Sequence, residues 1–194
     1  MAMLTPLQQH IEKLIDSESL LNHIDLTSYF DVITLKKKEI ILAQDSPCNE
    51  LYFVLKGCMR SYYVKNNGVE QTIDFAIENW WITDHLSFDQ KLSSAYSIQA
   101  VEQSTIAVIS REKYDLLLRE YDLLEKYFRK VYQRANAAAQ KRITYLYDFT
   151  REELYFHFEA QFPWFIQRIP QYLIASYLGF SPEYLSEIKK KRLS

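Results

Sequence analysis

The sequence predicts an α+β protein, because strand-like and helix-like segments occupy separate parts of its 194 residues. Short runs rich in Val, Ile, Tyr and Phe fill residues 32–109, and turn signals such as Asn66-Asn67-Gly68 separate several of them. From Ser110 onward the spacing of apolar residues becomes helical. Several short strands in succession indicate an all-β barrel or sandwich, and a helical region follows it.

The composition excludes several classes of protein. The chain carries 23 basic and 25 acidic residues, and hydrophobic residues make up 48%, which is typical of a folded globular protein and rules out a disordered or collagen-like one. No apolar run approaches the roughly 18 residues that span a bilayer, and Met1–His10 lacks a signal-peptide core. Cys48 and Cys58 cannot form a disulfide framework or a CxxC metal clip. We therefore expect a soluble protein of the reducing cytoplasm.

Glycine is scarce, and its positions exclude a phosphate-binding loop. Gly57, Gly68 and Gly179 are the only glycines, and each stands where a periodic segment ends. Each glycine therefore indicates a turn, and neither a GxGxxG nor a P-loop motif is present.

The elements of the β region follow an N-terminal helix, which the apolar spacing predicts over Leu4–Ile15. Glu78–Ser94 interrupts the strands as an irregular, partly polar stretch. The predicted strands are Val32–Leu35, Glu39–Ala43, Leu51–Lys56, Met59–Val64, Val69–Ile77, Tyr96–Val101 and Thr105–Ile109.

Ser110 is a suitable N-cap for the first element of the helical region, a helix that ends near Glu120. A long helix follows, from about Asp122 to Tyr147. Cap-type residues at Asp148-Phe149-Thr150 separate it from a helix over Arg151–Ala160. Trp164–Ile169 is predicted as a short strand before Pro170.

The long helix has apolar or small residues that alternate at four and three positions, as in a coiled coil. Packing against the chain's own β domain is one interpretation of this pattern. We favour a seam between two chains, because the helix is long and carries apolar residues on more than one side. The predicted seam residues are Leu124, Phe128, Val131, Ala135 and Ala138.

The segment Gln171–Arg192 predicts a helix–turn–helix. Gly179 follows the first helix where a residue tolerant of positive φ is needed, and Ser181-Pro182-Glu183 starts the second helix with an N-cap, an N1 proline and a dipole-matched acid. The apolar residues that would join the two helices are Ile174, Ala175, Leu178, Leu185 and Ile188.

Two interpretations of this helix pair remain. An ordinary αα-corner needs no ligand, whereas in a DNA-binding pair the small residues Ala175 and Gly179 let the helices cross closely and the second helix enters the major groove. Residues 176–194 hold four basic and two acidic side chains, so they carry +2 and the rest of the chain −4. This balance suits contact with phosphates, although a solvated tail would look the same. We favour DNA binding.

The order of these parts resembles the Crp/Fnr transcription regulators. Its local matches are Leu51-Tyr52-Phe53-Val54-Leu55-Lys56-Gly57, Asp148-Phe149-Thr150 and the helix–turn–helix. The resemblance implies a β-roll (a double-stranded β-helix, like a cyclic-nucleotide-binding domain), a long dimerisation helix and a DNA-binding domain, working as a homodimer on double-stranded DNA. The expected domains are residues 1–121, 122–147 and 148–194.

The cassette that binds cyclic AMP in this family is not preserved. Where the family has a Gly-Glu pair, an Arg with a small hydroxyl residue, and helix hydroxyls, this chain has Thr83-Asp84, Ser94-Ala95 and Ala137-Ala138. A buried phosphate without a cationic partner is strongly disfavoured, so we expect no cyclic AMP and predict no cofactor. Asp84 retains the ability to accept from a ligand hydroxyl. The candidate pocket for an unknown effector comprises Phe75, Trp81, Asp84, His85, Ser94 and Tyr96.

The recognition helix also departs from the family pattern. Glu183 matches the family's glutamate, but Pro182 and Glu187 stand where the family has two arginines. The arginine contacts that read guanine are therefore lost. Glu183 retains the ability to accept a hydrogen bond from cytosine N4. We expect the wing hairpin that follows this helix in the family to be missing, and therefore fewer phosphate contacts. The candidate DNA-binding residues are Ser181, Glu183, Tyr184, Ser186, Glu187 and Lys190.

Three functions follow from these observations. The first is a DNA-binding regulator with an effector-sensing β-roll, and the second is a small-molecule-binding roll whose helical tail contacts proteins. The third is a cupin-like metalloenzyme, which needs clustered ligands, whereas His10, His23, His85 and His157 are scattered. Two cysteines are also too few for an iron–sulfur cluster, and a lone His85 is a poor haem ligand. We expect the regulator, with no metal and no enzymatic activity.

Overall fold

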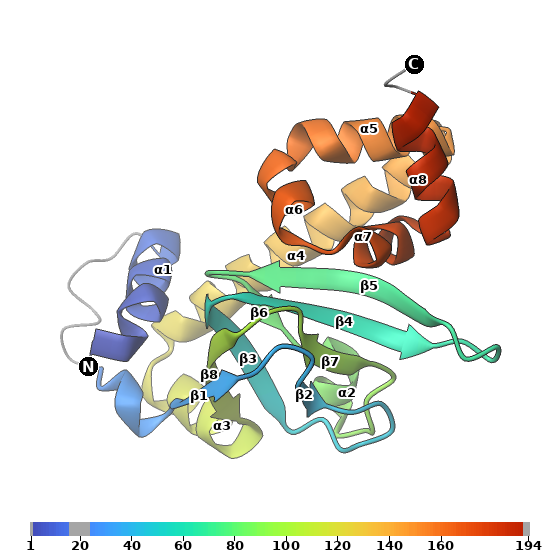
Figure 1. Cartoon of the computed structure of the whole chain (residues 1–194). Helices are drawn as coiled ribbons and strands as arrows, with labels where there is room; N and C mark the ends of the chain where they lie inside the picture. The colour runs from blue at the N-terminus through green and yellow to red at the C-terminus, as the bar shows by residue number, and fades with distance from the viewer. Residues whose placement is uncertain (1, 16–23, 192–194) are drawn as a thin grey trace. The chain divides into compact units, whose positions relative to one another are not determined.

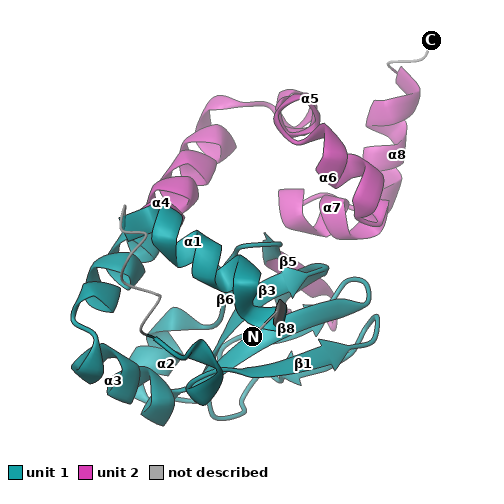
Figure 2. Cartoon of the chain, turned by 90° about the vertical axis from the view of Figure 1, so that its left-hand side faces the viewer, with its two compact units in different colours: residues 1–63, 74–133 teal, residues 64–73, 134–194 magenta. Residues whose placement is uncertain are grey.

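The computed structural model describes residues 2–15 and 24–191; His23 and Arg192 therefore lie outside the described residues. The chain divides into two compact units, one formed by Met1–Tyr63 and Asp74–Gln133, the other by Val64–Ile73 and Arg134–Ser194 (Figure 2). This division passes through the long helix and groups residues 64–73 with the C-terminal helices. The expected boundaries after residues 121 and 147 stay predictions.

The strands form two antiparallel four-stranded sheets (Figure 1). One has the order β1 (Asp31–Leu35), β8 (Ser104–Ser110), β3 (Glu50–Lys56), β6 (Trp81–Ile82), and the other β2 (Ile40–Leu42), β7 (Ser97–Ala100), β4 (Cys58–Val64), β5 (Glu70–Ile77). All seven predicted strands are confirmed. The strand β6 and the short helix α2 (His85–Gln90) were not predicted, because neither is long enough to display a period.

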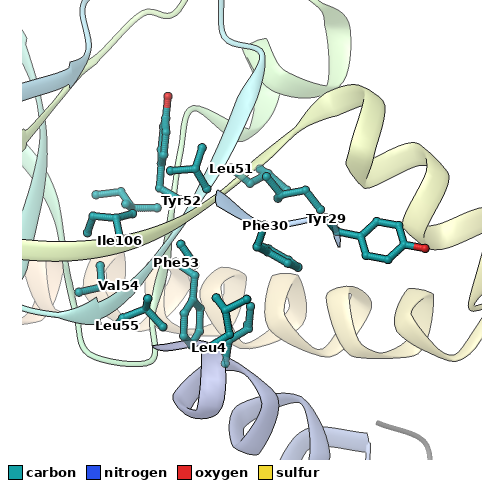
Figure 3. Packing of buried hydrophobic residues seen from close by; sticks show 14 of the residues in the cluster. Leu4, Tyr29, Phe30, Leu51, Tyr52, Phe53, Val54, Leu55 and Ile106 are labelled. Atoms are coloured by element: carbon teal, nitrogen blue, oxygen red, sulfur yellow. The ribbon is translucent and has the colours of Figure 1, made fainter. Parts of the chain in front are cut away.

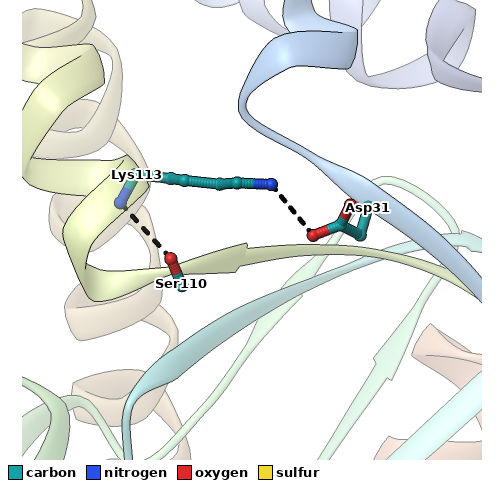
Figure 4. Close-up of polar contacts among 3 residues, drawn as sticks. All are labelled: Asp31, Ser110 and Lys113. Atoms are coloured by element: carbon teal, nitrogen blue, oxygen red, sulfur yellow. Dashed lines mark hydrogen bonds and ion pairs between the residues drawn. The ribbon is translucent and has the colours of Figure 1, made fainter.

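The first unit also contains α1 (Thr5–Ile15), preceded by a 3₁₀ turn at Ala2–Leu4, and α3 (Arg111–Glu120); a further 3₁₀ turn spans Leu26–Ser28. Ser110 caps α3 as predicted, because its Oγ accepts from the Lys113 backbone N–H at 3.3 Å. The Lys113 ammonium reaches Asp31 of β1 at 3.0 Å (Figure 4). This pair is solvent-exposed, so it contributes at most about 1 kcal/mol.

The hydrophobic core of this unit gathers around β3, whose residues 51–55 are all buried (Figure 3). Residues of β8 and α1 pack on it, among them Ile106 and Leu7. Leu124, Tyr127 and Phe128, from the first turns of α4 (Leu123–Asp148), belong to the same core.

This packing corrects the predicted dimer seam. Leu124 is 0% exposed and Phe128 is 4% exposed within the single chain, so neither can reach a second one. Val131 is half-buried against the same core, whereas Ala135 and Ala138 are exposed. The apolar alternation therefore marks, in its first part, the face that covers the chain's own β-roll.

A series of hydrogen bonds runs through the core and joins β6, α4 and α1. The Trp81 indole N–H of β6 donates to the Tyr127 hydroxyl at 2.8 Å, and that hydroxyl lies 2.8 Å from Nδ1 of His10 on α1. Burial raises the pKa of Tyr127, so it is a neutral hydroxyl at physiological pH. These hydrogen bonds hold α1 and α4 against the roll, and they give the buried polar atoms their partners.

The second unit is mainly helical, with α5 (Arg151–Gln161), α6 (Pro163–Arg168), α7 (Gln171–Leu178) and α8 (Pro182–Lys191). Thr150 and Glu153 form a capping box at the start of α5. The strand predicted over Trp164–Ile169 is wrong, because Pro163 takes the first helical position and starts α6 there. Among the described residues, no helix is both long and apolar enough to cross a membrane.

The first residues of β5 contact α7 within the second unit. Ser176 Oγ accepts from the Thr72 backbone N–H at 2.8 Å and donates to the Glu70 carbonyl at 3.0 Å. The Arg142 guanidinium of α4 donates to the Ile73 carbonyl and, at 2.8 Å, to the Tyr177 carbonyl. These bonds fix the C-terminal turn of α7 against residues 70–73.

Candidate nucleic-acid interface and effector site

The helices α7 and α8 form the predicted helix–turn–helix. Each of the five predicted contact residues is buried, and Ala175, Ile174, Leu185 and Ile188 are at most 1% exposed. The turn is closed by the Phe180 N–H donating to the Ala175 carbonyl at 2.8 Å. Ser181 then caps α8, since its Oγ accepts from the Tyr184 N–H at 3.2 Å.

Gly179 has one of the two roles that the sequence suggested. Its φ of +80° is left-handed, as expected for the residue that ends a helix in this way. A Cβ built on Gly179 meets no atom within 4 Å, so close approach of the helices does not require glycine here. The backbone conformation alone explains this residue.

One face of α8 points away from the buried side and carries most of the predicted DNA-binding residues. Ser181, at the cap, and four residues of the helix are exposed, whereas Tyr184 is half-buried beside Phe180. The exposed helix residues are Glu183, Ser186, Glu187 and Lys190. The spacing of three and four places these residues in one stripe, which is the shape that enters a major groove.

The two glutamates of this stripe differ in what they contact. The pKa of Glu183 lies below its ordinary value, because its own backbone N–H and the Ser181 hydroxyl donate to the carboxylate. Glu183 therefore takes part in capping α8. Glu187, one turn further on, makes no hydrogen bond or ion pair to a described residue, so its carboxylate is available to a ligand.

The start of α5 lies along one side of α8. Glu152 accepts from the Lys191 ammonium at 2.9 Å, near the end of α8. The Arg151 guanidinium lies 5.7 Å from the centre of the Tyr184 ring, in the first turn of α8. This neighbourhood carries no signal in the sequence, because 33 positions separate Arg151 from Tyr184.

In the β-roll, Asp84 organises the loop where the family has its cassette. Asp84 caps α2 by accepting from the Ser87 N–H at 3.1 Å, and its second oxygen accepts from the Ser87 hydroxyl at 2.9 Å and the Ala95 N–H at 2.8 Å. Ser94 Oγ lies 3.3 Å from the same oxygen. Although burial raises the pKa of Asp84, these hydrogen bonds lower it overall. The carboxylate is therefore engaged in the loop, and its role as an acceptor for a ligand hydroxyl stays a prediction.

The other residues of the predicted effector pocket lie in different surroundings. Trp81 belongs to the aromatic core with Phe53, and its N–H is used by Tyr127. His85 is exposed on α2, with its ring edge-on to Tyr132 at 5.1 Å. Phe75 is buried in β5, and Tyr96 is half-buried before β7 with its backbone bonded to Ser94. Of the six residues, only Asp84, Ser94 and Tyr96 come together through hydrogen bonds that define one loop.

A different hollow of about 620 Å³ lies between β2 and the start of β3. Residues 40–43 supply its apolar wall, and Glu50, Tyr52 and Ser110 lie on its polar side. None of the six predicted pocket residues lines it.

The roll also contains a buried cation that was not predicted. Arg60 of β4 is 3% exposed, stacks on Tyr62 at 4.1 Å and donates to Gln99 Oε1 at 2.7 and 3.0 Å. Over residues 2–15 and 24–191, no group of three or more His, Cys, Asp or Glu side chains could hold a metal ion.

Comparison with known proteins agrees with this architecture. Residues 32–121 match the family model of the cyclic nucleotide-binding domain. The β-roll is therefore similar to cyclic nucleotide-binding domains over these residues. The sequence matches no curated protein.

Solved structures resemble nearly the whole chain, including the helices that follow the cyclic nucleotide-binding domain. FixK2 from Bradyrhizobium japonicum is 17% identical with a TM-score of 0.66, over 84% of this chain and 83% of that one. A Eubacterium rectale protein assigned to the Crp/Fnr family of transcriptional regulators is 17% identical with a TM-score of 0.68, over 89% and 85%. The catabolite activator protein of Thermus thermophilus is 18% identical with a TM-score of 0.54, over 94% and 82%. The predicted α+β fold of a Crp/Fnr-type regulator is thus confirmed.

Proposed function

We propose that this chain is a homodimeric, sequence-specific DNA-binding transcription regulator whose cyclic nucleotide-binding domain does not use cyclic AMP. The observation that carries DNA binding is the outward stripe of α8. Its polar residues stay exposed while Leu185 and Ile188 are buried against α7, and a helix pair of this kind has an unpartnered polar face of major-groove shape.

Selection of bound sequences from random duplex DNA at physiological salt tests this function. A dimeric regulator enriches a two-fold symmetric motif whose half-sites lie about one helical turn, or roughly 34 Å, apart. Replacing Glu187 and Lys190 by Ala should abolish the enrichment. Binding that shows no preference among sequences would contradict the proposal and favour a helical tail that contacts proteins.

The dimer would use a different face of α4 from the one that the sequence suggested. Tyr132, Ala139, Ile143 and Leu146 form a stripe with spacings of seven, four and three, and all four side chains are exposed. This stripe is turned by roughly 50°, or about a seventh of the helix circumference, from the line of Leu124 and Phe128. Exposed apolar residues in such a repeat suit the corresponding stripe of a second copy.

The effector statement rests on the loop around Asp84. The serine and alanine at positions 94 and 95 offer no cation to a cyclic phosphate, and the Asp84 carboxylate already accepts from Ser87 and Ala95. Calorimetry with cyclic AMP should therefore give no binding heat at micromolar concentrations. Tight binding of one nucleotide per chain would overturn this part of the proposal and leave the DNA-binding part standing.

A further inference from the structure

We propose that Arg151, at the start of α5 and outside the helix–turn–helix, is a DNA-phosphate contact that extends the recognition surface of α8. This inference rests on the proposed DNA-binding function and names a residue through which it acts. Its starting point is charge, because the stripe of α8 that would face the groove is not basic. The stripe contains Glu183 and Glu187 but only one cation, Lys190. Attraction to the DNA backbone must therefore come from neighbouring side chains.

The tertiary contacts place Arg151 beside this stripe. The Arg151 guanidinium lies 5.7 Å from the Tyr184 ring centre, and the adjacent Glu152 pairs with Lys191 at 2.9 Å. Tyr184 and Lys191 are seven positions apart, so the start of α5 follows about 10 Å of the side of α8. An arginine on this side can meet a phosphate while the stripe of α8 faces the bases.

The electrostatics of α5 indicate that Arg151 is not there for stability. A cation in the first turn of a helix is unfavourable, because the helix dipole is positive at that end. The two acids of that turn do not compensate it, since Glu153 is engaged in the capping box with Thr150 and Glu152 in the pair with Lys191. Arg151 itself is exposed and makes no hydrogen bond or ion pair to a described residue. An uncompensated charge in this place is available for an anion.

The salt dependence of DNA affinity tests the inference. The dissociation constant of the full chain for its selected duplex and for an unrelated duplex is measured between 50 and 300 mM salt, for the wild type, Arg151→Ala and Arg151→Lys. We expect Arg151→Ala to weaken both complexes by a similar factor, about tenfold at physiological salt. The slope of log affinity against log salt should fall by about 0.9 per protomer, as for one lost phosphate contact. Arg151→Lys should keep the slope.

The controls separate a phosphate contact from a structural role. Arg119→Ala removes an exposed arginine of α3, in the other unit, and should leave affinity and slope unchanged. The melting temperature of Arg151→Ala should be equal to or above that of the wild type, because the replaced charge opposes the helix dipole. An unchanged slope, or a loss confined to the selected duplex, would overturn the inference and make Arg151 a support for Tyr184. Failure of the wild type to bind any duplex would instead contradict the proposed function itself.

Discussion

Asp84 is a buried carboxylate whose ionised form is stabilised by the loop around it. Since hydrogen bonds from Ser87, Ala95 and Ser94 outweigh burial, its pKa in the folded chain is lowered. A lowered pKa means that the carboxylate contributes stability above its unfolded pKa of about 3.9, and that this contribution is lost as the pH falls through the folded value.

Asp84→Asn should destabilise the chain by about 1–3 kcal/mol at pH 7, because an amide has one acceptor oxygen and its NH₂ group meets the donors of the loop. The difference from the wild type should begin to narrow as the pH falls below the unfolded pKa of about 3.9, and it should disappear only below the lowered pKa of the folded chain, where Asp84 itself becomes protonated. Urea unfolding at pH 7 and pH 3.5 measures both. Asp89→Asn, an exposed acid on the same helix α2, is the control and should change little; equal effects of the two substitutions would contradict the role given to Asp84.

The two glutamates of α8 should have separate effects. Glu187 has a carboxylate that no described group occupies, and a carboxylate in the major groove accepts from the cytosine amino group. Glu187→Gln should therefore relax the preference at one position of each half-site, with a loss of about 1–3 kcal/mol of discrimination. Glu183→Gln should instead lower the melting temperature slightly and keep the preferred sequence, because Glu183 caps the helix. Repeating the duplex selection with each variant shows which glutamate contacts a base. If only Glu183→Gln relaxed the preference at a position of the half-site, the roles given to Glu183 and Glu187 would be reversed.

At the scale of elements, the turn from β3 to β4 depends on a glycine for two reasons. Gly57 has φ of +106°, and a Cβ there would lie 2.3–2.7 Å from atoms of Ser104, in the strand β8 that pairs with β3. Gly68, at the tip of the next hairpin, has φ of +81° but open space around it. The same substitution at the two sites therefore separates backbone strain from steric overlap.

Gly57→Ala should lower the free energy of unfolding by about 1–3 kcal/mol through backbone strain and by about 1–3 kcal/mol more through overpacking. Gly68→Ala should lose only the first of these contributions. Urea unfolding of both variants measures the difference. Equal losses would mean that Ser104 yields easily and that the close approach at Gly57 contributes little.

At the scale of the whole molecule, the proposed dimer depends on the second half of α4. Ile143 and Leu146 are 53% and 50% exposed in the single chain, which is unusual for large apolar side chains on one helix face. A charge introduced there would have to be buried in the dimer, at a large free-energy cost.

The double substitution of Ile143 and Leu146 by Glu should convert a dimer into a monomer in sedimentation velocity, with the helical signal unchanged. Thr144→Glu places a carboxylate on a different side of the same turn, where the side chain is also exposed, and should remain dimeric. A wild-type monomer, or a double variant that is still a dimer, would contradict the proposed seam.

The sequence by itself determined the order and type of nearly all elements. Strand alternation and helical spacing are local properties, and residues such as Ser110, Gly179 and Ser181 mark the ends of helices through their own backbone bonds. The helix–turn–helix was predictable for this reason, because its apolar residues and its turn lie within one short segment. The prediction of a strand over residues 164–169 was wrong, because six residues are too few to distinguish the strand period from the helix period. Pro163 starts a helix there instead.

Only the tertiary structure decided which groups are free and which are occupied. The spacing of Leu124 and Phe128 fits a seam and a core equally well, and burial of both residues in the core cluster of the first unit selects the core. From the sequence, Asp84 is a candidate for binding a ligand, but in the structure its carboxylate accepts hydrogen bonds from Ser94 and Ala95 of the loop. Arg151 gains its place beside α8 through contacts that bridge more than thirty positions. Periodicity reports the repeat of a single element, whereas these properties depend on the partners that folding brings from elsewhere in the chain.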